Sequence, residues 1–165
     1  MEAGRGEQAV ATASGMAAIL TTVMSLCSAG DHILVSRSVF GATVTLFEKY
    51  FKRFGIEVDY VPLTDTAAWR DACKPNTRMF FIESPSNPLA ELGDIGALGA
   101  IARELGSSRP LIVTDTGLKD LYPVQHALEA LRGDGFEVAV FSDVKPNPTG
   151  TNVADLQILL LAPRG

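Results

Sequence analysis

Helix-type and strand-type patterns alternate along this 165-residue chain, and this alternation restricts its fold more than any other feature. Short apolar runs typical of buried strands occur at His32–Val35, Glu57–Val61, Met79–Glu83, Leu111–Thr114 and Glu137–Phe141. Stretches with helical spacing precede or separate them, at 14–28, 44–54, 67–73, 95–105 and 118–132. Strands joined by helices form right-handed crossovers and a mostly parallel sheet covered on both faces. The sequence therefore predicts a three-layer α/β/α sandwich with about five strands. The apolar run at 155–161 fits either a sixth strand or a helix.

Composition and charge favour a small-molecule ligand. The net charge is −5, so the chain has no basic footprint for nucleic acid or for an anionic membrane. Apolar runs fall short of the roughly 20 residues that span a bilayer, and the start of the sequence lacks the apolar region of a signal peptide, which predicts a cytoplasmic protein. Cys27 and Cys73 have no disulfide or zinc spacing and are expected to be buried, reduced thiols. With His32 and His126 as the only histidines, no metal site is expected.

The candidate site follows from where such sheets bind ligands, which is beyond the carboxyl ends of the strands. Polar residues follow four of the predicted strands, at 36–38, 83–88, 115 and 142–145. In addition, Ser14-Gly15-Met16 opens the first helix, where free N–H groups and a glycine suit a phosphate. An ordinary Ser N-cap is the alternative interpretation of Ser14.

Several motifs occur together in the order of one known family. They are Ala9-Val-Ala-Thr-Ala-Ser-Gly-Met-Ala-Ala-Ile19, Gly30-Asp-His32, Ser36-Arg-Ser-Val-Phe-Gly41 and Glu83-Ser-Pro-Ser-Asn-Pro-Leu89. In these the chain resembles the Cys/Met-metabolism pyridoxal-phosphate (PLP) enzymes, and within them the sulfhydrylase branch. The resemblance implies part of the large domain of a type I PLP-transferase fold and a homodimer or higher homo-oligomer. It also implies transsulfuration chemistry of methionine and cysteine metabolism, in which sulfide replaces the γ-substituent of an activated homoserine.

The resemblance assigns cofactor contacts to the first half of the chain. Gly15 and Met16 would offer backbone N–H groups to the cofactor phosphate, and Ser14 is counted with them as a cofactor-binding residue. Phe40 would stack on the pyridine ring, with packing in the core as the alternative. Many relatives carry Tyr at this position, and the missing hydroxyl fits the sulfhydrylase branch better than the lyase branch. Asn87 would lie beside the phenolic oxygen.

Two further anchors are expected in the second half of the chain, because this chemistry needs a carboxylate at the pyridine nitrogen and a lysine for the aldehyde. Asp115 follows an apolar strand, as the family's aspartate does. The residues after the next strand resemble the family's Ser-x-Thr-Lys motif at Ser142 and Lys145. Ser142 would lie at the cofactor, and Lys145 would be the catalytic lysine. Val144 replaces the threonine that would bind phosphate.

From Arg109 onward the sequence also resembles the amino-terminal part of iron-dependent alcohol dehydrogenases, most specifically at Asp143-Val-Lys-Pro-Asn-Pro-Thr149. This predicts a chimera joined between Leu105 and Arg109. Its segments would be 1–106 (PLP-enzyme-like), 107–154 (a βαβ extension) and 155–165 (a tail), forming one compact unit. The strand at 111 should then lie in the same sheet as the strand at 79. A chain without the family's carboxyl-terminal domain is expected to bind cofactor rather than complete the reaction. The alternatives are a non-catalytic recombined scaffold and an NAD(P)-binding fragment.

Overall fold

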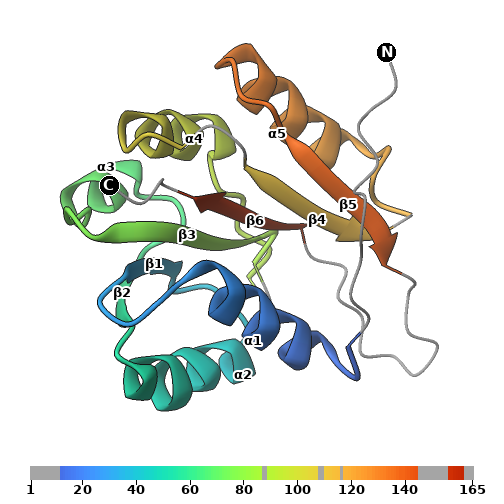
Figure 1. Ribbon diagram of the computed structural model, residues 1–165. Coiled ribbons are helices and arrows are strands. Elements are labelled where there is room, and N and C mark those ends of the chain that lie inside the picture. Colours follow the sequence, from blue (N-terminus) through green and yellow to red (C-terminus); the bar gives the residue numbers. More distant parts are fainter. Residues whose placement is uncertain (1–11, 87–88, 108–109, 116, 145–155, 162–165) are drawn as a thin grey trace.

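A computed structural model describes residues 12–86, 89–107, 110–115, 117–144 and 156–161. Within these residues the chain forms one six-stranded sheet with helices on both faces (Figure 1). The strand order is β2-β1-β3-β6-β4-β5. The strands are β1 His32–Ser36, β2 Glu57–Val61, β3 Thr77–Ser84, β4 Leu111–Asp115, β5 Ala139–Val144 and β6 Leu156–Leu161. The predicted α/β class with a mostly parallel sheet is confirmed.

Strand β6 is the exception to the parallel arrangement. β1 pairs in parallel with β2 and β3, and β4 pairs in parallel with β5. β6 runs antiparallel to both β3 and β4, so those two strands point the same way. The strand at 111 therefore shares a sheet with the strand at 79, as predicted, but β6 lies between them. The ambiguous run near the carboxyl end is a strand, and its mostly apolar sequence suits a strand with neighbours on both sides.

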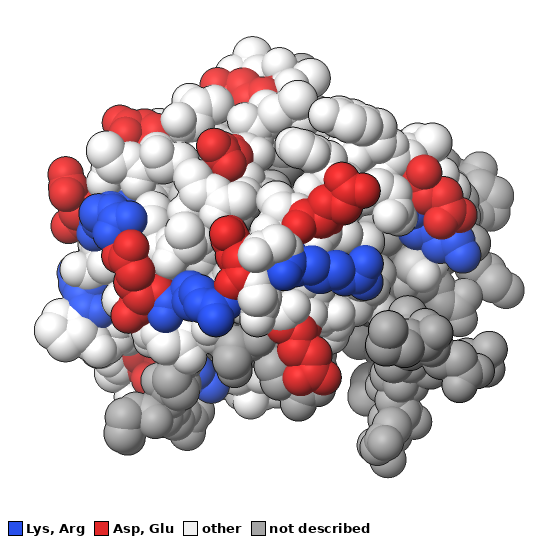
Figure 2. Space-filling model, turned by 90° about the horizontal axis from the view of Figure 1, so that it is seen from above, with Lys and Arg blue, Asp and Glu red and all other residues white. Residues whose placement is uncertain are grey.

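Helices cover the two faces of the sheet in separate groups (Figure 1). One face carries α1 Gly15–Leu26 and α2 Gly41–Leu46, which continues into the π-helical turn η1 Phe47–Phe51 and the 3-10 turn η2 Lys52–Phe54. The other face carries α3 Thr66–Asp71, α4 Ile95–Glu104 and α5 Tyr122–Gly133. On the side of the molecule seen in Figure 2, acidic and basic side chains are interspersed, and neither sign forms a continuous patch.

Local sequence explains where these helices begin and end. The side chains of Ser14, Asp65 and Asp94 each accept the backbone N–H three residues later, so each satisfies a donor that the first helical turn leaves unpaired. Gly55 follows η2 with φ +80°, a left-handed conformation that glycine adopts without strain. The predicted helices are thus confirmed, with shifts of a few residues at their ends.

The core consists of two apolar clusters, one on each face of the sheet. Under α3, α4 and α5, Trp69 and Phe80 pack together with ring centroids 5.2 Å apart. Under α1, α2 and η1, Phe47 contacts Phe51 and Phe81. Neither cysteine forms a disulfide within the described residues, and Cys27 is buried whereas Cys73 is only half-buried. None of the helices in the described part of the chain combines the length and hydrophobicity needed to cross a membrane.

Candidate functional site

The carboxyl ends of the five parallel strands lie at one edge of the sheet, here called the carboxyl edge. Ser36, Ser84 and Asp115 end β1, β3 and β4 at this edge, and β5 ends there at Val144. Helix α1 begins on the same side of the molecule as the arrowheads of β3, β4 and β5 (Figure 1). The structure therefore brings the start of α1 and the described ends of β1, β3, β4 and β5 to one edge.

The first turn of α1 leaves two backbone donors available. Ser14 is the N-cap, and its Oγ accepts the N–H of Ala17 at 3.2 Å, while its carbonyl accepts the N–H of Ala18. Within the described residues, the N–H groups of Gly15 and Met16 have no acceptor, because the first turn of a helix offers none. The cap and an anion site are thus compatible, since they use different N–H groups. Ser14 and Gly15 are both exposed.

Phe40 lies at the carboxyl edge with its ring at the surface. Phe40 precedes α2 and is 52% exposed. The alternative interpretation of Phe40 as a core residue is therefore wrong. Its backbone N–H donates to Oε2 of Glu83 at 2.9 Å, which connects the start of α2 to the end of β3.

The loop after β3 is closed by its own side chains. Glu91 Oε2 accepts hydrogen bonds from the hydroxyls of Ser38 at 2.7 Å and Ser86 at 3.4 Å, so this loop is also linked to the one after β1. The N–H of Gly93 donates to Ser84 Oγ at 3.1 Å. The Ser84–Pro85 peptide bond is cis. Asn87, predicted at the cofactor's phenolic oxygen, lies outside the described residues.

The remaining predicted residues belong to β4 and β5. Asp115 is the last residue of β4, and Ser142 is a half-buried residue of β5. Lys145 lies outside the described residues. Because β6 lies between β3 and β4, two strand spacings of about 4.8 Å separate those two strands. A ligand that touches both the loop after β3 and the end of β4 must therefore bridge about 10 Å.

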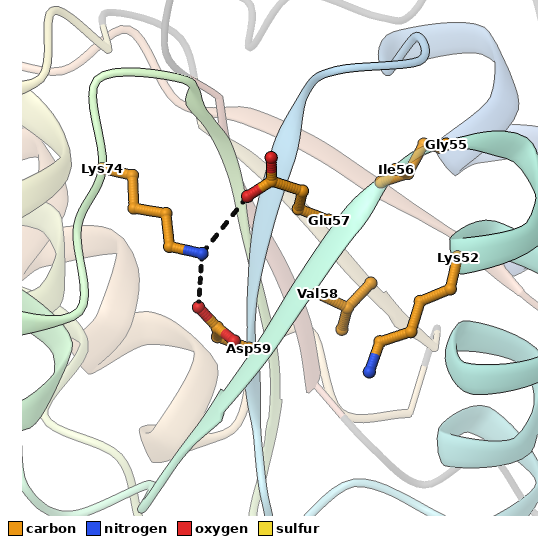
Figure 3. Close-up of a pocket in the computed structure, with 7 residues that line it drawn as sticks. All are labelled: Lys52, Gly55, Ile56, Glu57, Val58, Asp59 and Lys74. Carbon is orange, nitrogen blue, oxygen red and sulfur yellow. Dashed lines mark hydrogen bonds and ion pairs between the residues drawn. The ribbon is translucent and has the colours of Figure 1, made fainter.

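A hollow of about 400 Å³ lies at the opposite, amino edge of the sheet, and it is lined by Lys52, Gly55, Ile56, Glu57, Val58, Asp59 and Lys74 (Figure 3). Its charged groups are largely engaged with one another. Lys74 Nζ lies 2.8 Å from Asp59 and 3.2 Å from Glu57, and Lys52 lies on the other side of β2 (Figure 3). In the part of the chain that the structure describes, no three His, Cys, Asp or Glu side chains are arranged to hold a metal ion. This hollow does not contain any predicted site residue.

His32 is fully buried beside this hollow. Its Nδ1 lies 2.8 Å from Thr77 Oγ1, and its Nε2 lies 3.2 Å from Asp59 Oδ2. Burial, and then the positive charge of Lys74, lower the pKa of His32 below its ordinary value of 6.5. The hydrogen bond from Lys74 holds the pKa of Asp59 below 3.8.

These shifts predict that the protein loses stability on mild acidification. As the pH falls through 6.5, His32 takes up a proton in the unfolded chain more readily than in the folded one, so the free energy of unfolding decreases. Asp59 adds a further loss only below about pH 3.8. Urea unfolding between pH 7.5 and 5 measures how steeply the free energy of unfolding falls with pH. His32→Gln should reduce this pH dependence. The control is His126→Gln, which changes the exposed histidine stacked on Tyr122 and should leave the pH dependence as it is. An unchanged pH dependence in His32→Gln would contradict the assignment.

Comparison with known proteins identifies the family of this chain. The model of the family described as Cys/Met metabolism PLP-dependent enzyme matches residues 1–127. The chain belongs to this family. Its cofactor is pyridoxal phosphate, in agreement with the cofactor predicted from the motifs at 14–16 and 83–88.

Individual proteins are also similar to this chain. The O-succinylhomoserine sulfhydrylase of Pseudomonas aeruginosa is 74% identical over 101 residues, which cover 61% of this chain and 25% of that enzyme. The O-acetyl-L-homoserine sulfhydrylase of Corynebacterium glutamicum is 41% identical over 112 residues, 67% of this chain and 25% of that enzyme. A crystal structure of cystathionine gamma-lyase from Lactobacillus plantarum complexed with L-serine is 30% identical with a TM-score of 0.64, over 92% of this chain and 37% of that one. The chain thus spans about a quarter of the length of the two sulfhydrylases.

The predicted resemblance to iron-dependent alcohol dehydrogenases is not supported. The family match continues through residue 127 and so crosses the junction expected between Leu105 and Arg109. The comparisons do not support the likeness of the later residues to iron-dependent alcohol dehydrogenases.

The described residues at the carboxyl edge fit the family's cofactor. The unpaired N–H groups of Gly15 and Met16 suit a phosphate, and the exposed ring of Phe40 offers an aromatic face at the same edge. Sequence reasoning did not assign roles to Glu83, which links the start of α2 to the end of β3, or to Glu91, which links the loops after β1 and β3. Glu83 could have been found, because a carboxylate at the end of a buried apolar strand is unusual unless it has donors.

Proposed function

We propose that this chain forms the cofactor-binding side of a PLP-dependent sulfhydrylase, which replaces the γ-substituent of an activated homoserine by sulfide. The observation that carries the proposal is the free start of α1 at the same sheet edge as the exposed ring of Phe40. The printed names of the two sulfhydrylases support an O-acylated homoserine as the substrate class. A cytosolic homo-oligomer remains part of the proposal.

Each site residue has a separate task in this proposal. Bound pyridoxal phosphate supplies an electron sink that stabilises negative charge at the substrate's Cα and then Cβ. The N–H groups of Gly15 and Met16 would hold the phosphate, with Ser142 beside it. Asp115 would keep a proton on the pyridine nitrogen. Since Phe40 has no hydroxyl, proton transfer at Cα and Cβ would fall to Nζ of Lys145.

The experiment adds pyridoxal phosphate to the chain, records its visible absorbance, reduces with borohydride and maps the labelled peptide. We expect one label, on Lys145. An unlabelled chain that still unfolds cooperatively would instead indicate a non-catalytic scaffold. Thermal stabilisation by NAD(P), and not by pyridoxal phosphate, would indicate a dinucleotide site. Sulfide-dependent release of succinate from O-succinylhomoserine, measured on the same sample, tests the prediction that the 165 residues bind cofactor without completing the reaction.

A further inference from the structure

The carboxyl group of Glu83 connects the end of β3 to the residue that offers its ring to the cofactor. Glu83 is 2% exposed, and its Oε2 accepts the backbone N–H of Phe40 at 2.9 Å. Its Oε1 lies 3.5 Å from the hydroxyl of Thr43, which is one turn further along the chain in α2. Thr43 is also buried. A buried carboxyl group is costly unless donors satisfy it, so these contacts are a built feature and not an incidental approach.

The position of the Phe40 ring depends on its backbone more than on its packing. Phe40 is about half exposed, so the protein packs against only part of it. Val39, directly before Phe40, and Thr43, three residues after it, are buried and anchor the segment. The Phe40 N–H at the start of α2 still needs an acceptor. Glu83 supplies that acceptor from a strand of the central sheet.

We propose that Glu83 is a positioning residue for the cofactor site: by holding the backbone of Phe40, it sets the plane in which the exposed ring meets the pyridine. This inference rests on the proposed function. Glu83 is also the first residue of the Glu83-Ser-Pro-Ser-Asn-Pro motif that the family resemblance assigns to the cofactor, so one buried carboxyl group connects this motif to Phe40.

The first test needs no cofactor. Amide hydrogen exchange at Phe40 is measured in the unmodified chain, in Glu83→Gln and in Glu83→Ala. Loss of a hydrogen bond to a carboxylate should raise the exchange rate about tenfold or more in Glu83→Ala. Glu83→Gln should raise it less, because its amide oxygen can still accept the Phe40 N–H. The matched control is Asp94→Asn, which alters the carboxylate cap of α4 on the other face of the sheet and should not affect Phe40. Unchanged exchange in Glu83→Ala overturns the proposal.

The second test asks whether Glu83 acts through Phe40. Pyridoxal phosphate affinity and the visible circular dichroism of the bound cofactor are measured in a cycle of Glu83→Ala, Phe40→Leu and the double variant. We expect Glu83→Ala to weaken binding about tenfold and change the dichroism when Phe40 is present, with little added effect in Phe40→Leu. Independent, additive effects would show a merely structural role and overturn the proposal. If the unmodified chain binds no pyridoxal phosphate, the proposed function fails, and the exchange experiment alone decides whether Glu83 holds Phe40.

Discussion

Replacing Lys145 with Ala is expected to abolish the covalent capture of pyridoxal phosphate. In the proposed site the Lys145 amine holds the cofactor's aldehyde, and no other group is assigned that bond. The visible absorbance should disappear, and borohydride labelling should fall from near-stoichiometric to background. Peptide mapping by mass spectrometry measures both the amount and the position of the label. The phosphate would still be able to bind at the start of α1, so weak reversible binding should remain.

The control for this prediction is Lys119→Ala. Lys119 also follows a strand that ends at the carboxyl edge, and it is half-buried, with its carbonyl accepting a hydrogen bond from Gln125. Its amine has no role in the proposed site, so its removal should leave the label unchanged. A label that persists in Lys145→Ala, or that is lost in Lys119→Ala, would show that the lysine has been wrongly assigned.

Much of the architecture follows from local sequence. The strand predicted at Glu57–Val61 has those bounds in the structure, and the helix predicted at 95–105 ends one residue earlier. These elements are decided by side-chain periodicity, Asp and Ser caps and glycine stops, all of which act within a few residues. Their parallel arrangement follows because helical crossovers permit little else.

The place of β6 could not be predicted in the same way. Its apolar run allows a strand, but which strands it pairs with depends on a long connection and on two partners that are distant in sequence, β3 and β4. Phe40 shows the same limit, because an aromatic residue beside a predicted strand favours a core position on its own. Its backbone is held by Glu83, a residue 43 positions away in the sequence. Tertiary contacts of this kind leave no local pattern.

The largest loss of stability is expected for Trp69→Ala. Trp69 is fully buried between α3 and the sheet, packs against Phe80 and donates its indole N–H to the carbonyl of Pro62 at 2.9 Å. Removing a buried aromatic ring of this size lowers the free energy of unfolding by about 3–5 kcal/mol, through lost burial and the cavity that remains. Urea unfolding should be followed by circular dichroism, because this residue is the only tryptophan in the sequence.

Trp69→Phe separates the two contributions. A phenyl ring still fills much of the space but cannot donate to Pro62, whose half-buried carbonyl keeps the N–H of Asp65 as a donor. The lost hydrogen bond should therefore cost less, about 0.5–1.5 kcal/mol. Trp69 packs against Phe80 in β3, and the candidate-site residue Glu83 lies further along the same strand. A substitution of Trp69 should therefore affect the site only by lowering the stability of the whole fold. Pyridoxal phosphate binding in Trp69→Phe should therefore fall only in proportion to the unfolded fraction. A loss below 1 kcal/mol in Trp69→Ala would contradict the central place of this ring in the core.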